Sequence, residues 1–430
     1  MSDKFDVVVV GAGLAGATAA FVAASAGQQV ILAERGSRPG SKTVSGGLLY
    51  THALARLWPK FWEEDPCPVE RAIDRNVLTL LTPDQALSVD HFDARFGRPP
   101  YNSFSVLRSR LDPWVAGKAE AAGATPVYGV KVDGLVREGA RVVGIQAGGE
   151  ELRADVVVLA DGANALTARR SGLEPEGDPR HTGVGVKQVI ELPPGEVDKR
   201  FQLTGRSGTQ YTTVGFPTKV EGGGFLYTNR DTLSLGMIIN LRSLVERNVS
   251  MYDVLEEYKQ HPFIARLLEG GSLVEYSGCF VGEGGYDSLP PLAGDGYLLA
   301  GSAAGFFLNT GFTLRGMDFA IESGRLAGEA AVAAVRAKDP TARGLSGYAA
   351  SLEQSFVMRE LREFRGYPSV FQNPRLYEQY PRLAATLLDR LYSVDGRGRP
   401  PLRSVLKETV RGGPSPLDLV RDLWSAARRL

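Results

Sequence analysis

The sequence predicts an α/β fold in which a parallel-sheet domain is interrupted by an inserted antiparallel sheet and followed by a helical C-terminal region. Three observations carry this prediction. An apolar strand, a glycine-rich turn, an alanine-rich helix and a second strand follow one another within the first 35 residues. Two further buried strands end in glycine-containing turns near residues 160 and 300. Between these turns, residues 183–284 hold segments of alternating polarity that are typical of antiparallel strands.

The first of these segments reads "FDVVVVGAGLAGATAAFVAASAGQQVILAER". A buried strand meets a GxGxxG motif that opens a helix running to about Ala26, which is the Rossmann-like pattern of a dinucleotide site. Gly11 permits the tight turn, Gly13 lets a pyrophosphate approach the backbone, and Gly16 lets the helix pack on the sheet. The helix N-terminus supplies free N–H groups and a positive dipole end.

Glu34 ends the second strand, where its carboxylate can accept hydrogen bonds from both ribose hydroxyls of an adenosine. The same carboxylate would repel a 2′-phosphate, which disfavours NADP. The motif alone does not separate FAD from NAD, and a glycine-rich structural turn without a ligand is the alternative interpretation.

Two later segments favour FAD. In "LRADVVVLADGANALTARRSGL", Asp161 and Gly162 follow a buried strand and resemble the DG motif of the flavoprotein hydroxylase superfamily. In "GYLLAGSAAGFFLNTGFTLRG", residues 301–305 resemble the GDAAG motif of that superfamily, in which the acidic residue binds the flavin ribityl chain. Ser302 replaces the acid here, and its hydroxyl makes a weaker hydrogen bond than a carboxylate. We expect a helix to begin near Thr313 and to direct its N-terminal N–H groups at the flavin.

Residues 106–124 resemble the superfamily helix that carries an arginine near the flavin, with Arg108 in that place. The alternative for Arg108 is a surface charge at a helix start. Paired strands follow, and Val132 stands where the superfamily backbone often touches the adenine. The chain contains no second GxGxxG motif between a strand and a helix, so we expect electrons to arrive from a protein donor and not from a bound pyridine nucleotide.

Composition limits the remaining classes. The chain has 430 residues, enough for two or three domains, and its 49 basic and 49 acidic residues argue against a nucleic-acid partner. Two cysteines, Cys67 and Cys279, and four scattered histidines have no metal-ligand spacing, so no metal site is predicted. The N-terminus lacks a signal-peptide pattern, and the apolar runs are shorter than the ~18 residues of a membrane span. We expect a cytoplasmic protein, peripheral to a membrane at most.

The loop "GSKTVSGGLLY" follows the second strand, where it would lie against the isoalloxazine ring. Together with "GFPTKVEGGGFLYTN", "EEYKQHPFIARLLEGG" and "LNTGFTLRGMDFAIESG", it resembles the electron transfer flavoprotein–quinone oxidoreductases, with FixC as the nearest subgroup. The resemblance covers roughly residues 5–395. It implies FAD, electron entry from the alpha and beta subunits of an electron transfer flavoprotein, and delivery to a membrane quinone at the inner face of the cell membrane.

Long members of this family carry a [4Fe–4S] cluster on a cysteine-rich C-terminal domain. This chain lacks those cysteines, which fits FixC-type systems, where a separate small ferredoxin-like subunit, FixX, supplies the cluster. The motifs and the resemblance together predict the following FAD-binding residues: Gly11, Ala12, Gly13, Leu14, Ala15, Gly16, Glu34, Arg35, Lys42, Ser45, Gly46, Arg108, Val132, Asp161, Gly162, Ser302, Gly311, Phe312 and Thr313.

The resemblance also places Gly222 and Gly223 where a Gly-Gly pair contacts the quinone ring, since bare backbone lets a flat ring approach. A hairpin loop without a ligand is the alternative. "GFLYTNRDTLSLGMIINL" is expected to continue as a strand of the sheet that covers FAD. The predicted organisation is a discontinuous FAD domain (1–75, 105–182 and 285–340), a quinone domain (76–104 and 183–284) and a helical region (341–430).

Residues 396–416 are rich in proline, glycine and basic side chains, which predicts an extended linker around one helical turn. Residues 417–430 form an amphipathic helix pattern that suits membrane contact, partner docking, or packing on the body of the protein. Two other functions stay open for the chain. One is a geranylgeranyl-reductase-like flavoprotein that saturates isoprenoid double bonds, and the other is a flavin-binding scaffold without turnover. No catalytic acid or base is assigned.

Overall fold

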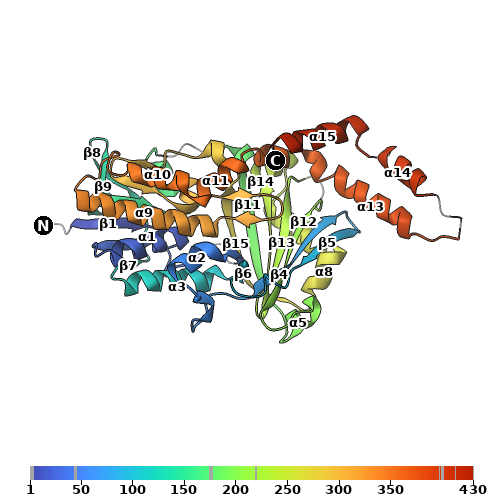
Figure 1. The fold of residues 1–430 in the computed structure, drawn as a ribbon, viewed down its shortest axis with the longest axis horizontal. Coiled ribbons are helices and arrows are strands. Elements are labelled where there is room, and N and C mark those ends of the chain that lie inside the picture. The colour runs from blue at the N-terminus through green and yellow to red at the C-terminus, as the bar shows by residue number, and fades with distance from the viewer. Residues whose placement is uncertain are drawn as a thin grey trace.

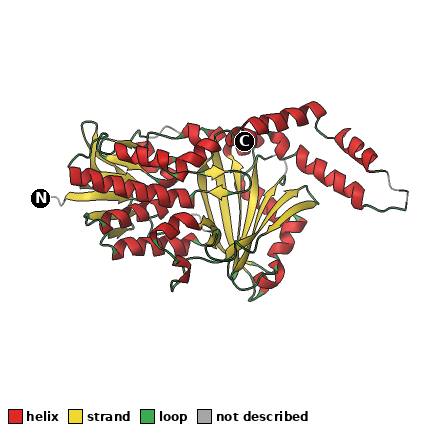
Figure 2. Ribbon diagram, in the orientation of Figure 1, coloured by secondary structure: helices red, strands yellow, loops and turns green. Residues whose placement is uncertain are grey.

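The computed structural model describes residues 4–42, 46–173, 178–217, 220–396, 398, 401–411 and 413–429. Two sheets lie next to each other along the longest axis, and the C-terminal helices extend beyond the second sheet (Figures 1 and 2). This arrangement bears out the predicted α/β fold with a second sheet and a helical C-terminal region.

The first sheet has eight strands around the predicted N-terminal unit. Its central strands are parallel, because β1 pairs with β2 on one side and with β10 on the other. The strand order is β16 (Ala293–Gly294), β17 (Tyr297–Leu299), β10 (Glu150–Leu159), β1 (Lys4–Val10), β2 (Val30–Glu34) and β7 (Thr125–Tyr128), and β9 (Arg141–Ala147) joins β10 to β8 (Val132–Glu138).

Three helices pack together on this sheet. Helix α1 (Leu14–Ser25) contacts both α3 (Arg108–Ala121) and α9 (Met317–Ala337). The contact between α1 and α9 is close, because a Cβ atom at Gly324 would lie 2.2 Å from the backbone oxygen of Ala15. Glycine at this position on α9 therefore allows two helix backbones to meet directly beneath the glycine-rich turn.

The second sheet has nine strands and is antiparallel except where β12 and β4 pair in parallel. Its order is β15 (Ser272–Gly282), β11 (Thr182–Glu191), β14 (Thr232–Asn240), β13 (Gly222–Thr228), β12 (Ser207–Val214), β4 (Ala72–Leu81), β6 (Ser103–Val106) and β3 (Gly47–Tyr50), with β5 (Ala86–Phe92) paired to β4. The apolar core on one side of it includes Tyr258 and Leu255 from helix α7 (Met251–Gln260).

The remaining helices lie between strands of the two sheets or form the C-terminal region. The former are α2 (Thr51–Leu57), α4 (Leu166–Arg170), α5 (Glu196–Phe201), α6 (Leu241–Arg247) and α8 (Pro262–Leu268). The latter are α10 (Ser346–Gln354), α11 (Phe356–Glu363), α12 (Tyr367–Phe371), α13 (Gln379–Tyr392), α14 (Leu402–Arg411) and α15 (Pro416–Arg429). Among the described residues, none of these helices has the length and apolar character needed to span a bilayer.

Three local expectations were wrong. The segment after Gly222 is a hairpin of two strands, β13 and β14, because Asn229 and Thr232 hydrogen-bond across a turn at residues 229–232. The region between residues 396 and 416 contains the helix α14 and not a single turn. The third concerns the start of α9. Strand β3 pairs within the nine-stranded sheet, and the predicted domain bounds stay a prediction.

The helix expected near Thr313 begins at Met317. Residues 308–315 instead form a small hairpin of β18 (Leu308–Asn309) and β19 (Leu314–Arg315). The Thr310 hydroxyl accepts a hydrogen bond from the Thr313 N–H at 3.1 Å, and the Asn309 side chain accepts one from Gly311 N–H at 2.8 Å. Such local side-chain bonds compete with helix formation and delay the helix start.

The close approach of α1 and α9 yields a stability prediction. Replacing Gly324 with alanine places a methyl group against the Ala15 carbonyl, so we expect Gly324→Ala to lower the free energy of unfolding by about 1–3 kcal/mol. Gly117 in α3 is a matched control, because a Cβ there meets no atom within 4 Å, and Gly117→Ala should stabilise the protein by about 0.5–1 kcal/mol. Chemical denaturation measures both values. Equal effects of the two variants would contradict the packing argument.

Candidate functional site

The glycine-rich turn opens onto a cavity of about 340 Å³, the dinucleotide cavity, which extends to the nine-stranded sheet. Thirteen of the residues predicted to bind FAD line it: Gly11, Gly13, Leu14, Ala15, Glu34, Arg35, Lys42, Gly46, Arg108, Val132, Asp161, Gly162 and Ser302. Ala12 and Gly16 lie behind this surface. Ser45 is outside the described residues, and the positions of Gly311, Phe312 and Thr313 are given below.

The three motif glycines have different surroundings. Gly11 has a φ of +99°, and a Cβ atom there would lie 2.5 Å from the Ala160 oxygen. A Cβ atom at Gly16 would lie 1.8 Å from the Gly11 oxygen. At Gly13, by contrast, a Cβ would meet only the Arg108 guanidinium, at 3.6 Å. Gly13 is therefore the position where a ligand can approach the backbone, next to the start of α1, which no side chain caps.

Two carboxylates hold the polar groups of this cavity in place. Glu34 accepts hydrogen bonds from Ala12 N–H at 2.9 Å and from Gly36 N–H at 2.7 Å, one on each oxygen. Each oxygen keeps a further lone pair for a ribose hydroxyl. Asp112, fully buried, forms a bidentate ion pair with Arg108 at 2.5 and 2.8 Å. This pair holds the Arg108 guanidinium beside Gly13, where it can face a pyrophosphate.

Asp161 is an independent sign that this cavity suits a polar ligand. One carboxylate oxygen accepts a hydrogen bond from Thr167 N–H at 2.8 Å, whereas the other is buried without a hydrogen-bond partner in the described part of the chain. Burial raises the pKa of this carboxyl group above its usual value. Because unpaired buried oxygens are costly, a ligand that donates a hydrogen bond here is favoured.

The far end of the dinucleotide cavity lies against the nine-stranded sheet, where Lys187 of β11 enters it. Its Nζ donates a hydrogen bond to the Gly46 oxygen at 2.5 Å and lies 5.1 Å from the centroid of the Phe225 ring. Burial lowers the pKa of Lys187 to about 8, so the side chain is mostly cationic at neutral pH. Lys187 was not predicted as a site residue, and its only signal in the sequence is a positive charge in the middle of a strand that is mostly apolar.

A second hollow, the apolar cavity, has a volume of about 320 Å³. It is enclosed by the face of β4, β12 and β13 and by the helices between residues 361 and 380. Gly222 and Gly223 line this cavity, and so do Gly311 and Phe312, which were predicted as flavin contacts. Thr313 lies in the same turn, with its hydroxyl 2.9 Å from that of Thr310.

The two cavities share one wall. Four apolar side chains contribute to both, namely Phe225, Ile238, Phe307 and Leu314. A ligand in the apolar cavity would thus be separated from the sheet end of the dinucleotide cavity by the thickness of one layer of side chains.

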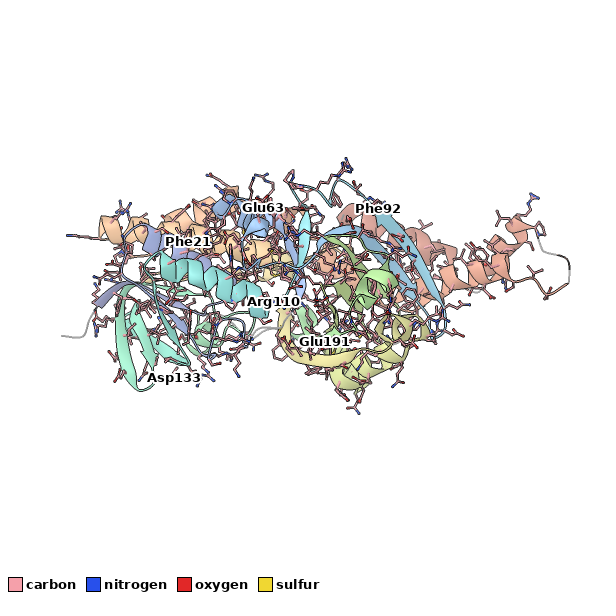
Figure 3. All side chains as sticks on the ribbon, turned by 90° about the horizontal axis from the view of Figure 1, so that it is seen from below. Phe21, Glu63, Phe92, Arg110, Asp133 and Glu191 are labelled. Atoms are coloured by element: carbon pink, nitrogen blue, oxygen red, sulfur yellow. The ribbon has the colours of Figure 1, made fainter. Side chains whose placement is uncertain are left out.

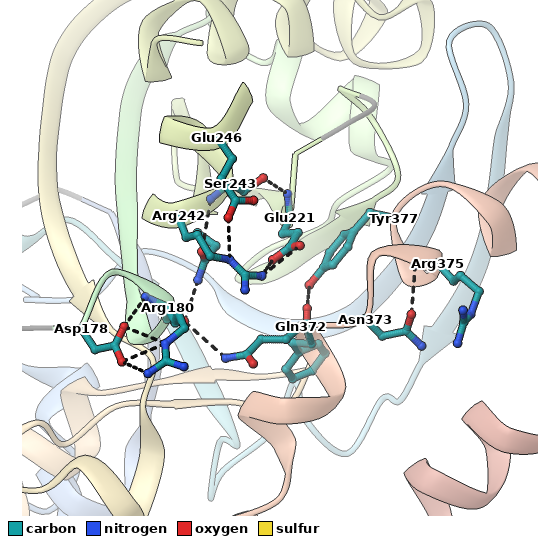
Figure 4. A network of polar contacts seen from close by, with 12 residues as sticks. Asp178, Arg180, Glu221, Arg242, Ser243, Glu246, Gln372, Asn373, Arg375 and Tyr377 are labelled. Carbon is teal, nitrogen blue, oxygen red and sulfur yellow. Dashed lines mark hydrogen bonds and ion pairs between the residues drawn. The ribbon is translucent and has the colours of Figure 1, made fainter. Parts of the chain in front are cut away.

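One end of the apolar cavity is lined by polar residues, and Figure 4 shows the network of polar contacts around them. Glu221 forms an ion pair with Arg242 at 3.0 Å, and Arg180 forms one with Asp178 at 2.7 Å. The side chains of Asn240 and Gln372 both donate to the Arg180 backbone oxygen, at 2.9 and 3.4 Å. Tyr377, Glu221, Arg180 and Glu283 line this end, and the sequence analysis identified none of them.

Three family models match successive parts of the chain. The family described as "FAD dependent oxidoreductase" matches residues 6–174, "ETF-QO, ubiquinone-binding" matches residues 182–280, and "ETF-QO/FixC family C-terminal domain" matches residues 354–430. Among curated proteins, the probable electron transfer flavoprotein-quinone oxidoreductase YdiS of Escherichia coli K12 is 45% identical over 94% of each chain. The protein FixC of the same strain is 42% identical over 98% of this chain and 97% of its own.

Solved structures share the fold at much lower sequence identity. A geranylgeranyl bacteriochlorophyll reductase-like protein from Thermoplasma acidophilum covers 98% of each chain, with a TM-score of 0.72 and 19% identity. The myxobacterial chondrochloren halogenase CndH has a TM-score of 0.66 and 17% identity, over 96% of this chain and 98% of its own. These likenesses establish the fold.

FAD is the cofactor, and the residues of the dinucleotide cavity fit it. Gly13 and Arg108 suit its pyrophosphate, Glu34 suits its ribose, and the unpaired Asp161 oxygen suits a donor on the ligand. With the ribose at Glu34, the ring system would lie toward the opposite end of the cavity, which is lined by Lys187 and by Gly316 and Met317 at the start of α9. When bound, FAD supplies redox chemistry at this end. The chain contributes positive electrostatic potential there from the Lys187 ammonium group and from the N-terminal end of the 21-residue helix α9.

The position of Lys187 predicts a change in reduction potential. A buried cation stabilises the negative charge of the reduced ring by about 1.5–3 kcal/mol, which corresponds to about 30–60 mV for a two-electron couple. We therefore expect Lys187→Met to lower the flavin potential by this amount in a redox titration at pH 7. Lys131→Met is the matched control, since Lys131 lines the opposite end of the same cavity. A potential that is unchanged in Lys187→Met would exclude this role.

Proposed function

The chain belongs to the electron transfer flavoprotein–quinone oxidoreductase/FixC family, and we propose that it passes electrons from an electron transfer flavoprotein through FAD to a membrane quinone. The protein is an FAD-dependent oxidoreductase. The end of the dinucleotide cavity that we assign to the flavin ring adjoins the apolar cavity. The wall of Phe225, Ile238, Phe307 and Leu314 is the observation that carries this proposal. Electrons have only one layer of side chains to cross, and no substrate atom has to touch the flavin.

The apolar cavity suits a quinone head group. Its wall combines aliphatic and aromatic side chains with a few polar groups at one end, which is the usual make-up of a site for a flat, weakly polar ligand. From the resemblance to the family, Gly222 and Gly223 were predicted to contact the quinone ring. Both glycines also have a packing role, because Cβ atoms there would lie 2.2 Å from the Ile238 oxygen and 2.5 Å from the Thr213 oxygen. Substituting them would disturb the sheet, so the cavity is better tested elsewhere.

The proposed partners follow from what the chain carries. It has one dinucleotide-binding motif and two cysteines, so a protein donor and a separate iron–sulfur carrier complete the electron route. We assign these roles to the two subunits of an electron transfer flavoprotein and to a small ferredoxin-like FixX subunit with a [4Fe–4S] cluster.

The C-terminal helices offer a surface for the membrane that holds the quinone, which we place at the inner face of the cell membrane. On α15, Leu417 and Val420 are 81% and 65% exposed. Tyr392 at the end of α13 and Leu402 on α14 are also exposed, as is Phe92 on the neighbouring strand β5 (Figure 3). Exposed apolar groups on amphipathic helices suit an interface with lipid.

This surface is connected to the apolar cavity. Asp422 on α15 forms a bidentate ion pair with Arg375 at 2.6 and 2.7 Å. It also accepts a hydrogen bond at 2.5 Å from the hydroxyl of Tyr380, a residue of the cavity wall. The arginine holds the pKa of the Asp422 carboxyl far below its usual range. A quinone leaving the bilayer would therefore enter next to the helix that contacts the lipid.

Saturation of an isoprenoid double bond is the second candidate, because the reductase-like protein from Thermoplasma acidophilum has the same fold. That similarity is at 19% identity, whereas the relatives at 42–45% identity carry the quinone oxidoreductase or FixC names, which favours quinone reduction. The third candidate is a non-catalytic scaffold. A scaffold would not require the apolar cavity to adjoin the dinucleotide cavity, which argues against this candidate.

Filling the apolar cavity tests this function. In an assay with electron transfer flavoprotein, the ferredoxin-like subunit and a short-chain quinone, we expect Thr212→Trp to lower kcat/KM at least tenfold, because its indole occupies the space of the head group. Thr212→Ser should stay within about twofold. Leu273→Trp adds the same side chain at an exposed site on β15 and should match the wild type.

A wild-type protein that leaves quinones unreduced but saturates an isoprenoid would favour the second candidate. A protein that turns over neither substrate would favour the scaffold. Retention of FAD by Thr212→Trp, measured from its absorbance, separates cavity filling from misfolding.

The exposed face of α15 yields a membrane prediction. Burial of a leucine or valine side chain contributes about 1.5–3 kcal/mol, so the double variant Leu417→Glu/Val420→Glu should bind phospholipid vesicles at least tenfold more weakly. The control variant Leu273→Glu/Val274→Glu changes two exposed apolar residues on β15 and should bind as the wild type does. Vesicle co-sedimentation measures both. Equal binding by the two variants would show that α15 does not contact the lipid.

A further inference from the structure

Glu283 lies at the polar end of the apolar cavity, directly after β15. Its backbone N–H donates to the His181 oxygen at 2.7 Å, which continues the pairing of β15 with the segment leading into β11. Across the sheet, Gly183 pairs with Asn240, and Asn240 N–H donates to the Glu221 oxygen at 2.8 Å. Residues from four neighbouring strands thus form one row at this edge of the sheet.

Gly183 controls where the Glu283 side chain can go. A Cβ atom at Gly183 would lie 2.9 Å from the carboxyl carbon of Glu283 and 3.1 Å from one of its oxygens. Without a side chain at this position, the Glu283 carboxyl lies across β11 and reaches Asn240, whose side chain hydrogen-bonds it. The glycine therefore makes room for a carboxyl group, and its hydrogen-bond partner fixes that group at the cavity wall.

The charged groups around Glu283 have other partners. Glu221, directly before β13, pairs with Arg242 of α6, and Arg180 pairs with Asp178 in the segment before β11. Tyr377 packs above them from the C-terminal region and donates its hydroxyl to the Phe371 oxygen at 2.8 Å. Within the described ranges, no cation forms an ion pair with Glu283. Burial accordingly raises the pKa of Glu283 to about 7, so a large fraction of the group is a neutral acid near pH 7.

We propose that Glu283 is the acid that donates a proton to the quinone oxygen during reduction in the apolar cavity. This inference rests on the proposed function and adds a catalytic residue to it. Three features carry it: the carboxyl lines the cavity, Gly183 and Asn240 hold it there, and the other carboxylate on the same wall, Glu221, is committed to an arginine. A general acid whose pKa lies near the working pH is the most effective donor.

Conversion of a quinone to a quinol adds two electrons and two protons. Both electrons come from reduced FAD, as the proposed function requires. The O–H bond of Glu283 breaks as a new O–H bond forms on one quinone oxygen, and the resulting carboxylate stays hydrogen-bonded to Asn240. Solvent supplies the second proton and restores the acid form of Glu283, and it would take up the protons that reduced FAD loses when it gives up its two electrons, so no net charge remains in the water.

Replacement of the acid by its amide tests the proposal in the reconstituted complex with a short-chain quinone. We expect Glu283→Gln to lower kcat by about 10²–10⁴-fold with little change in KM, because only the proton donor is lost. Reduction of ferricyanide, which takes up an electron and no proton, should stay within about twofold of the wild type. Glu283→Asp keeps an acid but shortens it, and should recover part of the lost rate.

The pH profile separates this role from a structural one. In the wild type, kcat should fall about tenfold per pH unit above about pH 7, as Glu283 loses its proton. Glu283→Gln should show no such fall. Glu221→Gln changes the other carboxylate of the cavity wall and should keep the wild-type fall, whatever happens to its KM.

The dependence of Tm on pH tests the state of Glu283 without enzymatic turnover, so a folding defect of the variant would not be mistaken for loss of the proton donor. Because burial raises the pKa of Glu283 from 4.5 to about 7, the native state holds this proton more tightly than the unfolded chain, and wild-type stability falls as the pH rises between these values. The Tm of Glu283→Gln relative to wild type should therefore increase from pH 5 to pH 8.

The outcomes distinguish the two proposals. If the wild type reduces quinone and Glu283→Gln does so at the same rate with the same pH profile, the proton-donor role is wrong and quinone reduction stands. If the wild type reduces ferricyanide but no quinone, both proposals fail. A Tm difference that is constant from pH 5 to pH 8 would show an ordinary exposed carboxylate and would also overturn the inference.

Discussion

The proposed function of this protein depends on a wall that is one side chain thick. Phe225, Ile238, Phe307 and Leu314 separate a cavity built for a dinucleotide from a cavity built for a flat apolar molecule. The wall is drawn from both structural units, since Phe225 and Ile238 come from the nine-stranded sheet and the other two from the segment leading into α9. Close packing of apolar side chains keeps water out of the wall while leaving the two ligands near each other.

The packing around each cavity allows the two cavities to share this wall. On the FAD side, α1 and α9 must approach closely so that the glycine-rich turn and the start of α9 can face the same ligand. Gly324 makes this possible. On the other side, β11 contributes Lys187 to the flavin end of one cavity, and its first residues carry Gly183 at the polar end of the other. Strand β11 therefore places one residue, Lys187, at the flavin end of the dinucleotide cavity and another, Gly183, beside Glu283, the proposed proton donor.

Local chemistry made one part of the site predictable from sequence. The GxGxxG turn, Glu34 and the Asp161-Gly162 pair each depend on a short stretch of chain whose conformation the residues themselves specify, and the structure places all of them around the dinucleotide cavity. Lys187 and Glu283 were missed because their roles arise from long-range pairing. The positions of Lys187 and Glu283 at the cavities can be recognised only after strands β15, β11, β14 and β13 have paired in the sheet. The start of α9 was misplaced because hydrogen bonds from Asn309 and Thr310 stabilise a turn that composition alone does not reveal.

The ion pair between Arg375 and Asp422 gives the C-terminal helix a second property. Because Asp422 holds both Arg375 and the cavity residue Tyr380, α15 cannot shift along its axis without pulling on the wall of the apolar cavity. Contact with a bilayer would hold that helix still, and detachment would release it. If α15 lies on a bilayer as proposed, any movement of this helix would also move Arg375 and Tyr380, and through Tyr380 the wall of the apolar cavity.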